Sequence, residues 1–270
     1  MSDGPRIAEP PELHRCYVRL HALAISASPI LSRRRFRLRA VESGRKVVSG
    51  GLKRQRKSSP LIVPHLGAYF SGASLVSDNV EPMPSVFITH PEVVIDPAVS
   101  IEQWQLSAVG RARARRLPAL FRGQVDWVVS SAERKATETA AILAGGLGVP
   151  AVIDATLGEM DRSATGYLPP DEFETVVDMF FAEPEESIRG WERAAEAQSR
   201  VVDAIRRHAS TGHADKNAFV SHGGVGGPLL ASLTGSSISR LLDQPTLGSY
   251  FAFDSLKWTS LSGWKRLPPR

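Results

Sequence analysis

Two histidines stand at the ends of two apolar runs that lie far apart in the sequence. His90 follows the run at 86–89, and His222 follows the run at 218–221. An imidazole can act as a nucleophile, exchange protons near neutral pH or donate a hydrogen bond to an anion. Polar residues at the carboxyl ends of parallel strands lie where open α/β sheets bind their ligands. The two runs therefore predict that His90 and His222 converge on one site.

A mainly parallel sheet covered by helices is needed to position these histidines. From Met83 onward, apolar runs typical of strands alternate with stretches typical of helices. We expect strands at 85–89, 126–130, 151–153 and 217–221, helices at 107–121, 134–145, 171–181 and 188–209, a helix beginning near Gly223, and a closing hairpin at 249–254 and 256–260. This alternation predicts an α/β fold, a three-layer α/β/α sandwich with a mainly parallel central sheet.

Local signals mark several boundaries of these elements. Ser107 and Asp171 are typical N-caps, so helices are expected to begin at these residues. The glycines within 145–148 are expected to end the helix that precedes them. The polar segment 158–170 is rich in turn residues and is longer than a minimal turn, which indicates a wall of the site.

Charge is unevenly distributed along the chain. Residues 1–82 carry 14 Lys and Arg against 6 Asp and Glu, whereas residues 83–270 carry 19 against 22. The basic segment has no sustained hydrophobic period, which indicates a disordered extension. A basic arm that contacts nucleic acid or an acidic membrane, a targeting peptide, and a native start at Met83 are the alternatives. We predict an N-terminal extension over 1–82 and one folded domain over 83–270, with no nucleic-acid partner except through the extension.

The remaining composition favours a cytoplasmic protein. Cys16 is the single cysteine, so an intramolecular disulfide is impossible, which fits a reducing compartment. No apolar run reaches the roughly 18–20 residues that span a bilayer. The stretch 20–31 is short and carries His21 and Pro29, unlike a stop-transfer segment or a secretory signal. We therefore expect no membrane partner.

The two histidines belong to a series of short motifs. In chain order the motifs are Thr89-His90-Pro91-Glu92, Leu106-Ser107-Ala108-Val109-Gly110-Arg111-Ala112-Arg113-Ala114, Ser130-Ser131-Ala132-Glu133-Arg134-Lys135-Ala136-Thr137-Glu138-Thr139-Ala140, Leu157-Gly158-Glu159 and Ser221-His222-Gly223-Gly224. Their order and spacing resemble the histidine phosphatase superfamily, also called the phosphoglycerate mutase-like fold. That family carries Arg-His-Gly, Ser-Ser-x-x-x-Arg-Ala, Leu-x-Glu and Ser-His-Gly-Gly in the same order.

The resemblance implies covalent catalysis without a metal or other cofactor. His90 would attack a phosphoryl group and become a phosphohistidine, and Glu159 would protonate the leaving oxygen and later accept a proton from water. His222 would donate a hydrogen bond to the phosphoryl oxygens, with Ser221 and Gly223 binding substrate beside it. The implied substrate is a phosphorylated small molecule or a phosphoprotein, including one that carries phosphohistidine.

The sequence departs from the family pattern where cations would hold the phosphate. Thr89 stands at the position of the first family arginine, Pro91 at that of the following glycine, and Asp96 at that of an asparagine. Lys135 stands at the position of the second arginine, where it offers a point charge in place of a planar fork.

Two further arginines are candidate substrate-binding residues that would compensate. Arg134 comes one residue before Lys135, and Arg162 lies in the polar segment 158–170. Cationic donors of this kind balance the oxyanion charge that persists through phosphoryl transfer.

Two alternatives to a histidine phosphatase remain open. One is a phosphate-binding or regulatory module that keeps the fold without the chemistry, which the departures favour. The other is a metal-dependent hydrolase with mixed imidazole and carboxylate ligands. Its candidate ligands are His90, Glu92, Asp96, Glu159, Asp161 and His222. No tight ligand spacing such as His-Glu-x-x-His supports the second alternative.

Overall fold

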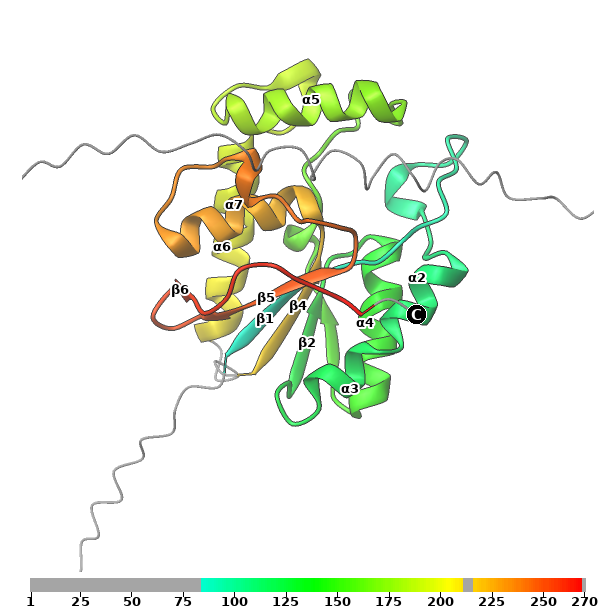
Figure 1. The fold of residues 1–270 in the computed structure, drawn as a ribbon, viewed down its shortest axis with the longest axis vertical. Helices are drawn as coiled ribbons and strands as arrows, with labels where there is room; N and C mark the ends of the chain where they lie inside the picture. The colour runs from blue at the N-terminus through cyan, green and yellow to red at the C-terminus, as the bar shows by residue number, and fades with distance from the viewer. Residues whose placement is uncertain (1–83, 211–215, 269–270) are drawn as a thin grey trace, which may run out of the picture. The chain divides into compact units, whose positions relative to one another are not determined.

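The computed structural model describes residues 84–210 and 216–268, and the predicted extension at 1–82 lies outside these ranges. The described chain forms a seven-stranded mixed sheet with helices on both faces (Figure 1). The strands are β1 (Ser85–Thr89), β2 (Trp127–Ser130), β3 (Ala151–Ile153), β4 (Asn217–Ser221), β5 (Ser249–Asp254), β6 (Thr259–Ser260) and β7 (Lys265–Arg266). This architecture confirms the predicted α/β class with a mainly parallel sheet.

Strand order places the two histidine-bearing strands next to each other. The order is β3-β2-β4-β1-β5-β6, with β7 paired to β5. The four strands from β3 to β1 pair in parallel, whereas β5 pairs antiparallel with β1, β6 and β7. In the β1–β4 pair Thr89 is opposite Ser221, so the residues that follow them leave the sheet side by side.

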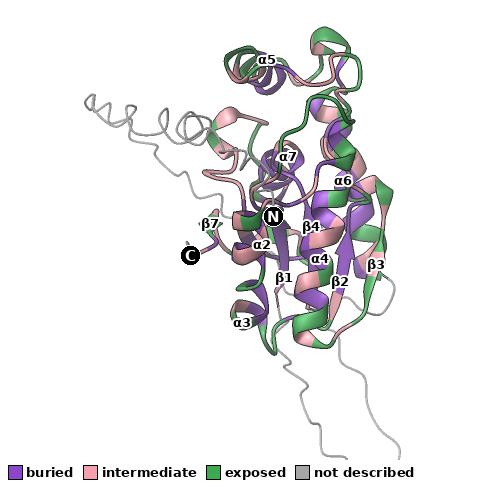
Figure 2. Ribbon diagram, turned by 90° about the vertical axis from the view of Figure 1, so that its right-hand side faces the viewer, coloured by how far each residue is buried: buried purple, intermediate pink, exposed green. Residues whose placement is uncertain are grey.

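Both central strands are buried along their whole length. Every residue of β1 and β4 is buried, as expected for parallel strands that are covered by helices on both faces. Figure 2 shows this buried centre between partly exposed helices. The continuous apolar runs that predicted these strands follow directly from this two-sided burial.

Helices divide into two groups that make two apolar cores. One face of the sheet carries α2 (Ala108–Ala114), α3 (Leu117–Phe121) and α4 (Arg134–Leu147). The other core is built with α5 (Pro170–Ala182), α6 (Ala194–Ser210) and α7 (Gly223–Thr234). Within the described ranges, each helix is too short or too polar to cross a bilayer.

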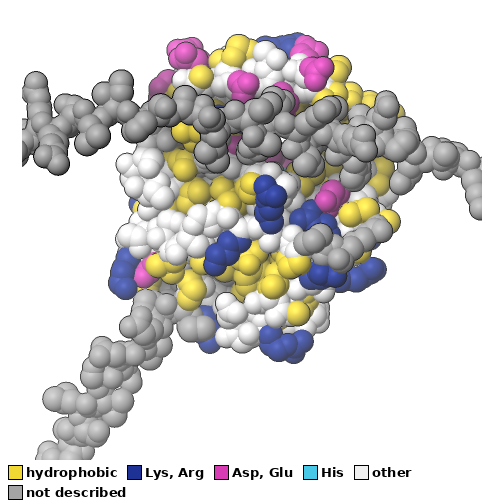
Figure 3. Space-filling view, in the orientation of Figure 1, with side chains coloured by type: hydrophobic (Ala, Val, Ile, Leu, Met, Phe, Trp, Pro, Cys, Tyr) yellow, Lys and Arg dark blue, Asp and Glu magenta, His cyan; other side chains and the backbone are white. Residues whose placement is uncertain are grey.

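Helix α5 is amphipathic and covers one end of the second core. Val176, Val177, Phe180 and Phe181 are buried in that core. The acidic side chains of the helix face outward and gather on the surface drawn in Figure 3. The apolar stripe therefore holds α5 in place while its other side stays solvated.

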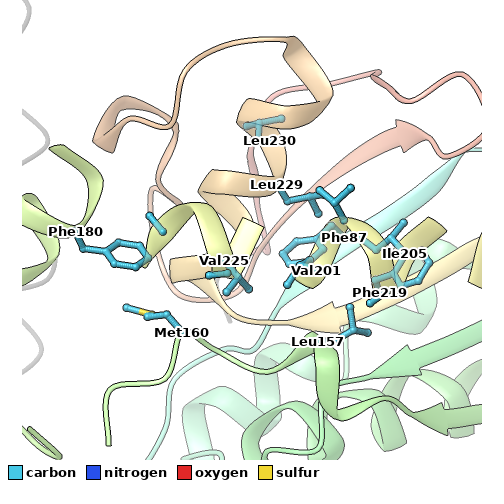
Figure 4. Packing of buried hydrophobic residues seen from close by; sticks show 14 of the residues in the cluster. Phe87, Leu157, Met160, Phe180, Val201, Ile205, Phe219, Val225, Leu229 and Leu230 are labelled. Carbon is cyan, nitrogen blue, oxygen red and sulfur yellow. The ribbon is translucent and has the colours of Figure 1, made fainter. Parts of the chain in front are cut away.

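The second core also fixes the loop that follows β3. Leu157 and Met160 belong to the same buried cluster as Phe87, Phe180 and Val225 (Figure 4). Leu157 is the last residue of the short helix η2 (Ala155–Leu157). Because Leu157 and Met160 are buried on either side of Glu159, the core determines where this carboxyl group lies.

Several predicted boundaries were wrong because long-range packing and proline decide them. The single helix expected at 107–121 is divided into α2 and α3, since Pro118 in the first turn of α3 cannot continue a helix from the preceding turn. Helix α4 continues through Gly146 and ends at Gly148, whose φ is 73°. A Cβ atom at Gly146 would lie 2.3 Å from Pro118 Cγ, so this glycine serves the packing of α3 on α4.

Two later helices also begin at other residues than expected. Helix α5 begins with Pro169 at its N-cap and Asp171 in its first turn. Helix α6 begins only at Ala194, because a separate 3-10 turn with Arg189 at a φ of 54° precedes it. The expected closing hairpin is present as the β5–β6 pair, and β7 adds a short strand that no sequence signal predicted.

Candidate active site

His90 directly follows β1 and is held in one tautomer by its neighbour. The backbone N–H of His90 donates to Ser221 O at 3.2 Å, and its Nδ1 lies 2.8 Å from Pro91 O. A carbonyl oxygen can only accept, so Nδ1 carries the proton and Nε2 keeps a lone pair. Burial, helped by the charge of Lys135, lowers the pKa of His90 to about 4. The ring is therefore neutral at physiological pH, with Nε2 available as a nucleophile or base.

His222 occupies the N-cap of α7, immediately after β4. Its ring centroid lies 5.3 Å from that of His90, and the two planes cross at 66°. Its Nε2 is 2.8 Å from Ser131 Oγ and 3.2 Å from Glu133 Oε1. Burial holds the pKa of His222 well below its ordinary value. Because a carboxylate accepts at Nε2, the proton of the neutral ring lies on this nitrogen, which makes His222 a hydrogen-bond donor.

Glu159 lies in the loop after β3, and its carboxyl group reaches the start of α7. Its Oε2 accepts from Gly224 N at 3.3 Å and its Oε1 accepts from Met160 N at 3.2 Å. Burial, followed by the nearby charge of Glu133, raises the pKa of Glu159 to about 7. A carboxyl group with this pKa can release a proton to a leaving group and take one back near neutral pH.

Gly224 permits this approach of the carboxyl group. A Cβ atom at this position would lie 2.7 Å from Glu159 Oε1 and 2.4 Å from Met160 Sδ. The second glycine of the Ser-His-Gly-Gly motif therefore makes room for Glu159 at the start of α7.

Lys135 and Glu133 form a largely buried ion pair beside His222 and Glu159. Lys135 lies in the first turn of α4, and its Nζ contacts Glu133 Oε2 and donates to Ile101 O at 2.9 Å. Glu133 Oε1 accepts from the backbone N–H of Glu159 at 2.8 Å. Although burial alone raises the pKa of Glu133, the electrostatic interactions with the polar His222 ring and the Lys135 ammonium, together with the hydrogen bonds from Lys135 and Glu159 N, hold it down at about 2, so the group is a carboxylate.

A cavity of about 390 Å³ opens beside this cluster. Ser131, Glu133, Glu159 and Arg162 are among the residues that line it. The Arg162 guanidinium lies 4.9 Å from the centre of the Phe173 ring, on α5. The polar segment 158–170 therefore forms a wall of the cavity and places an arginine there.

Arg134 and Ser221 were predicted to bind substrate, but in the structure their side chains contact other groups of the protein. Arg134 lies on the exposed side of α4, where its guanidinium contacts Glu138 Oε1 at 3.1 Å and Gln105 Oε1 at 2.9 Å, so the structure does not bring it into the cluster. Ser221 is buried, and its hydroxyl donates to Leu157 O at 2.7 Å. Ser221 thereby ties the end of β4 to the loop that carries Glu159.

Thr89 is buried at the position of the first family arginine and has a glutamine as its partner. Its hydroxyl donates to Gln244 Oε1 at 2.6 Å and accepts from Ser249 N at 2.9 Å. The Gln244 amide packs on Gly223, where a Cβ atom would lie 2.0 Å from Nε2. A neutral Thr89–Gln244 pair thus stands at the start of α7.

Glu92 and Asp96, the acidic residues that follow His90 in the sequence, contact groups outside this cluster. Glu92 pairs with the buried Arg113 at 2.5 Å, and Arg113 also donates to the carbonyl oxygens of Leu247, Gly248 and Leu267. Asp96 is exposed and accepts from Ala98 N. Across residues 84–210 and 216–268, no three His, Cys, Asp or Glu side chains are grouped closely enough to hold a metal ion. These positions give the metal-dependent alternative no geometric support.

Sequence reasoning missed two polar residues of this region, Glu133 and Gln244. Glu133 had a weak local signal, an unusual acid within the Ser-Ser motif before α4. Gln244 lies in an irregular segment and reaches Thr89 across 155 residues of sequence, so no local pattern could identify it.

Comparisons with known proteins agree with this geometry at the level of fold and family. Residues 100–260 match a protein family described as the histidine phosphatase superfamily (branch 1). That match begins after His90, so it does not itself align this histidine. No curated protein sequence matches the chain.

Solved structures, two of which are described as phosphatases, share the fold at low sequence identity. A mycobacterial glucosyl-3-phosphoglycerate phosphatase in complex with VO3 has a TM-score of 0.55 and 18% identity, over 68% of this chain and 96% of that one. A phosphoserine phosphatase from Entamoeba histolytica, in complex with 3-phosphoglyceric acid, has a TM-score of 0.51 and 15% identity, over 62% and 89%. Bacillus stearothermophilus YhfR has a TM-score of 0.52 and 20% identity, over 62% and 90%.

Proposed function

The chain belongs to the histidine phosphatase superfamily, branch 1, and we propose that it hydrolyses phosphomonoesters through a phosphohistidine on His90. The observation that carries this proposal is the contact between His90 Nδ1 and Pro91 O. Its Nδ1 is held 2.8 Å from Pro91 O, which leaves Nε2 unprotonated in a buried site. Pro91 lacks an N–H, but this role needs only its carbonyl oxygen.

In the first step, His90 Nε2 attacks phosphorus while the bond to the ester oxygen breaks. Glu159, protonated near neutral pH, gives its proton to the departing oxygen. The products are phospho-His90, a free alcohol and the Glu159 carboxylate. Splitting the displacement in this way replaces one difficult step with two easier ones.

In the second step, water attacks phospho-His90 and the phosphorus–nitrogen bond breaks. The Glu159 carboxylate takes the proton of the attacking water, and inorganic phosphate leaves. His90 and Glu159 return to their starting protonation states, so the cycle needs no external oxidant, reductant or metal.

Donors for the phosphoryl oxygens come from three elements. Lys135 supplies a charge from α4, His222 supplies its Nε2–H, and Arg162 supplies a guanidinium from the wall of the cavity. The amino end of α7 adds the partial positive charge of its peptide dipoles next to Gly223. Preorganised donors of this kind stabilise the charge that the transferring phosphoryl group carries.

A small phosphorylated molecule, or a phosphorylated side chain on a protein surface, is the proposed substrate class. The cavity of about 390 Å³ falls within the range of roughly 300–1,000 Å³ that is usual for small-molecule sites. The cavity lies next to Glu159, which supports entry of the ester from that side.

A phosphate-binding module without catalysis is the second candidate function. The observation that favours it is the Glu133 carboxylate, which neutralises the charge of Lys135 at the centre of the site. The buried Thr89, which offers no charge where the family has an arginine, points the same way.

Hydrolysis of p-nitrophenyl phosphate by the full chain separates these candidates. We expect turnover that persists in excess chelator and is lost in His90→Ala. His208→Ala is the matched control, because His208 pairs with Asp154 outside the cluster, and it should retain turnover. Absence of turnover in the unchanged chain would reject the phosphomonoesterase in favour of the binding module.

A further inference from the structure

The Glu133 carboxylate sits at the meeting point of three hydrogen-bond donors. Lys135 Nζ contacts its Oε2, while His222 Nε2 and the backbone N–H of Glu159 lie 3.2 Å and 2.8 Å from its Oε1. Three donors around two oxygens of one anion form the arrangement that an incoming phosphoryl group would also require. Glu133 comes from the turn before α4, so it can leave these donors without unfolding a helix.

We propose that Glu133 is a built-in anion that occupies the phosphate position and must be displaced before phosphate binds. The inference rests on the proposed function in one respect, that phosphate binds at Lys135 and His222. Among the described residues, Glu133 is the only carboxylate that pairs with Lys135, so its departure frees the buried charge. Because Glu133 must be displaced, it lowers the affinity of the site for anions. Only an anion that binds Lys135 and His222 more strongly than the Glu133 carboxylate can occupy the site.

If Glu133 only held Lys135 and His222 in position, its removal would have the opposite effect on phosphate binding. Buried lysine needs a counter-charge, and a carboxylate that only positions Lys135 and His222 would favour phosphate binding. Its removal would then loosen both donors and weaken binding. Removal of a competing anion strengthens binding, so the two roles of Glu133 give changes of opposite sign.

Binding of inorganic phosphate to the full chain, measured by titration calorimetry at neutral pH, tests this sign. We expect Glu133→Gln, which keeps the shape and removes the charge, to lower the Kd for phosphate at least about tenfold. Glu133→Leu should do the same without a hydrogen-bonding side chain. Glu138→Gln, in the helix that follows Glu133, is the matched control, because Glu138 contacts Arg111 and Arg134, and the Kd of this variant should stay unchanged.

An equal or higher Kd in Glu133→Gln, in a variant whose circular dichroism matches the unchanged chain, overturns the inference. Failure of the unchanged chain and of every variant to bind phosphate overturns it as well. The measurement is independent of turnover: tighter phosphate binding without hydrolysis keeps the inference and rejects the phosphatase. Hydrolysis with an unchanged Kd rejects only the inference.

Crystals of the unchanged chain grown in saturating phosphate give a second test if both variants fail to fold. Phosphate should contact Lys135 Nζ and His222 Nε2, with the Glu133 carboxylate moved away from both. Phosphate bound elsewhere, or bound while Glu133 keeps its contact with Lys135, contradicts displacement.

Discussion

His90 and His222 leave neighbouring parallel strands with ring centroids 5.3 Å apart, yet their protons lie on different nitrogens. Pro91 O fixes the proton of His90 on Nδ1, whereas the Glu133 carboxylate fixes that of His222 on Nε2. One ring therefore offers a lone pair and the other offers a donor. This difference supports the proposed roles of His90 as the nucleophile and of His222 as the donor to the phosphoryl oxygens.

Activity should be confined between the pKa values of His90 and Glu159. Protonation of His90 blocks attack, so kcat/KM should fall as the pH drops through about 4. Ionisation of Glu159 removes the general acid, so kcat/KM should also fall as the pH rises through about 7. A pH–rate profile of an alkyl phosphate in chelator measures both limbs, because its leaving group, unlike p-nitrophenolate, needs the acid. A rate that keeps climbing well above neutrality would contradict the role of Glu159.

Gly224→Ala should damage catalysis without unfolding the chain. The added Cβ would lie 2.7 Å from Glu159 Oε1, so the carboxyl group must move. Displacement of a catalytic group by about 1 Å can cost about 10²-fold in kcat. Gly145→Ala is the control: it meets no neighbour within 4 Å in α4 and should raise stability by about 0.5–1 kcal/mol. Equal kcat in both variants would argue against the constraint at Gly224.

Arg113→Met should strongly destabilise the fold. The buried guanidinium joins Glu92, in the segment after His90, to carbonyl groups at Leu247, Gly248 and Leu267. Its removal leaves an uncompensated carboxylate and should cost about 3–5 kcal/mol in urea unfolding. Arg111→Met, on the same helix but in a partly exposed pair, should cost about 0–1 kcal/mol. Similar losses of stability in the two variants would show that the contacts of Arg113 do not stabilise the segment after His90.

Thr89→Val keeps the shape of the side chain and removes two hydrogen bonds. Ser249 N and Gln244 Oε1 would lose their partner, which should lower stability by about 1–3 kcal/mol. Thr175→Val, at an exposed position of α5, should change it by less than about 0.5 kcal/mol. Thermal unfolding of both variants compares the two sites. An unchanged Tm in Thr89→Val would mean that other contacts hold Gln244 in place.

Local patterns predicted the sheet because burial acts on each strand separately. The runs that end at Thr89 and Ser221 are apolar since both faces of β1 and β4 are covered, and this also predicted where His90 and His222 emerge. Helix ends were less predictable. The continuation of α4 past Gly146 depends on Pro118, which lies on another helix.

Some features of the site also follow from the local sequence, whereas others depend on contacts between residues far apart in the chain. The place of Glu159 beside the start of α7 follows from a local motif, but its raised pKa depends on burial and on the charge of Glu133, which is 26 residues away. Arg134 and Lys135 are adjacent, and only the helix register separates the exposed side chain from the buried one. The Thr89–Gln244 pair depends on tertiary contacts that no spacing in the sequence reveals.

Detection of the phosphoenzyme shows whether His90 is the nucleophile. Glu159→Gln should accumulate it from p-nitrophenyl phosphate, because the second step loses its base while this leaving group needs little help from an acid. After a quench in base, since phosphohistidine is labile in acid, mass spectrometry should place one phosphoryl group on the peptide that carries His90. A phosphoryl group on another residue, or none on His90 at any time during turnover, would contradict the account.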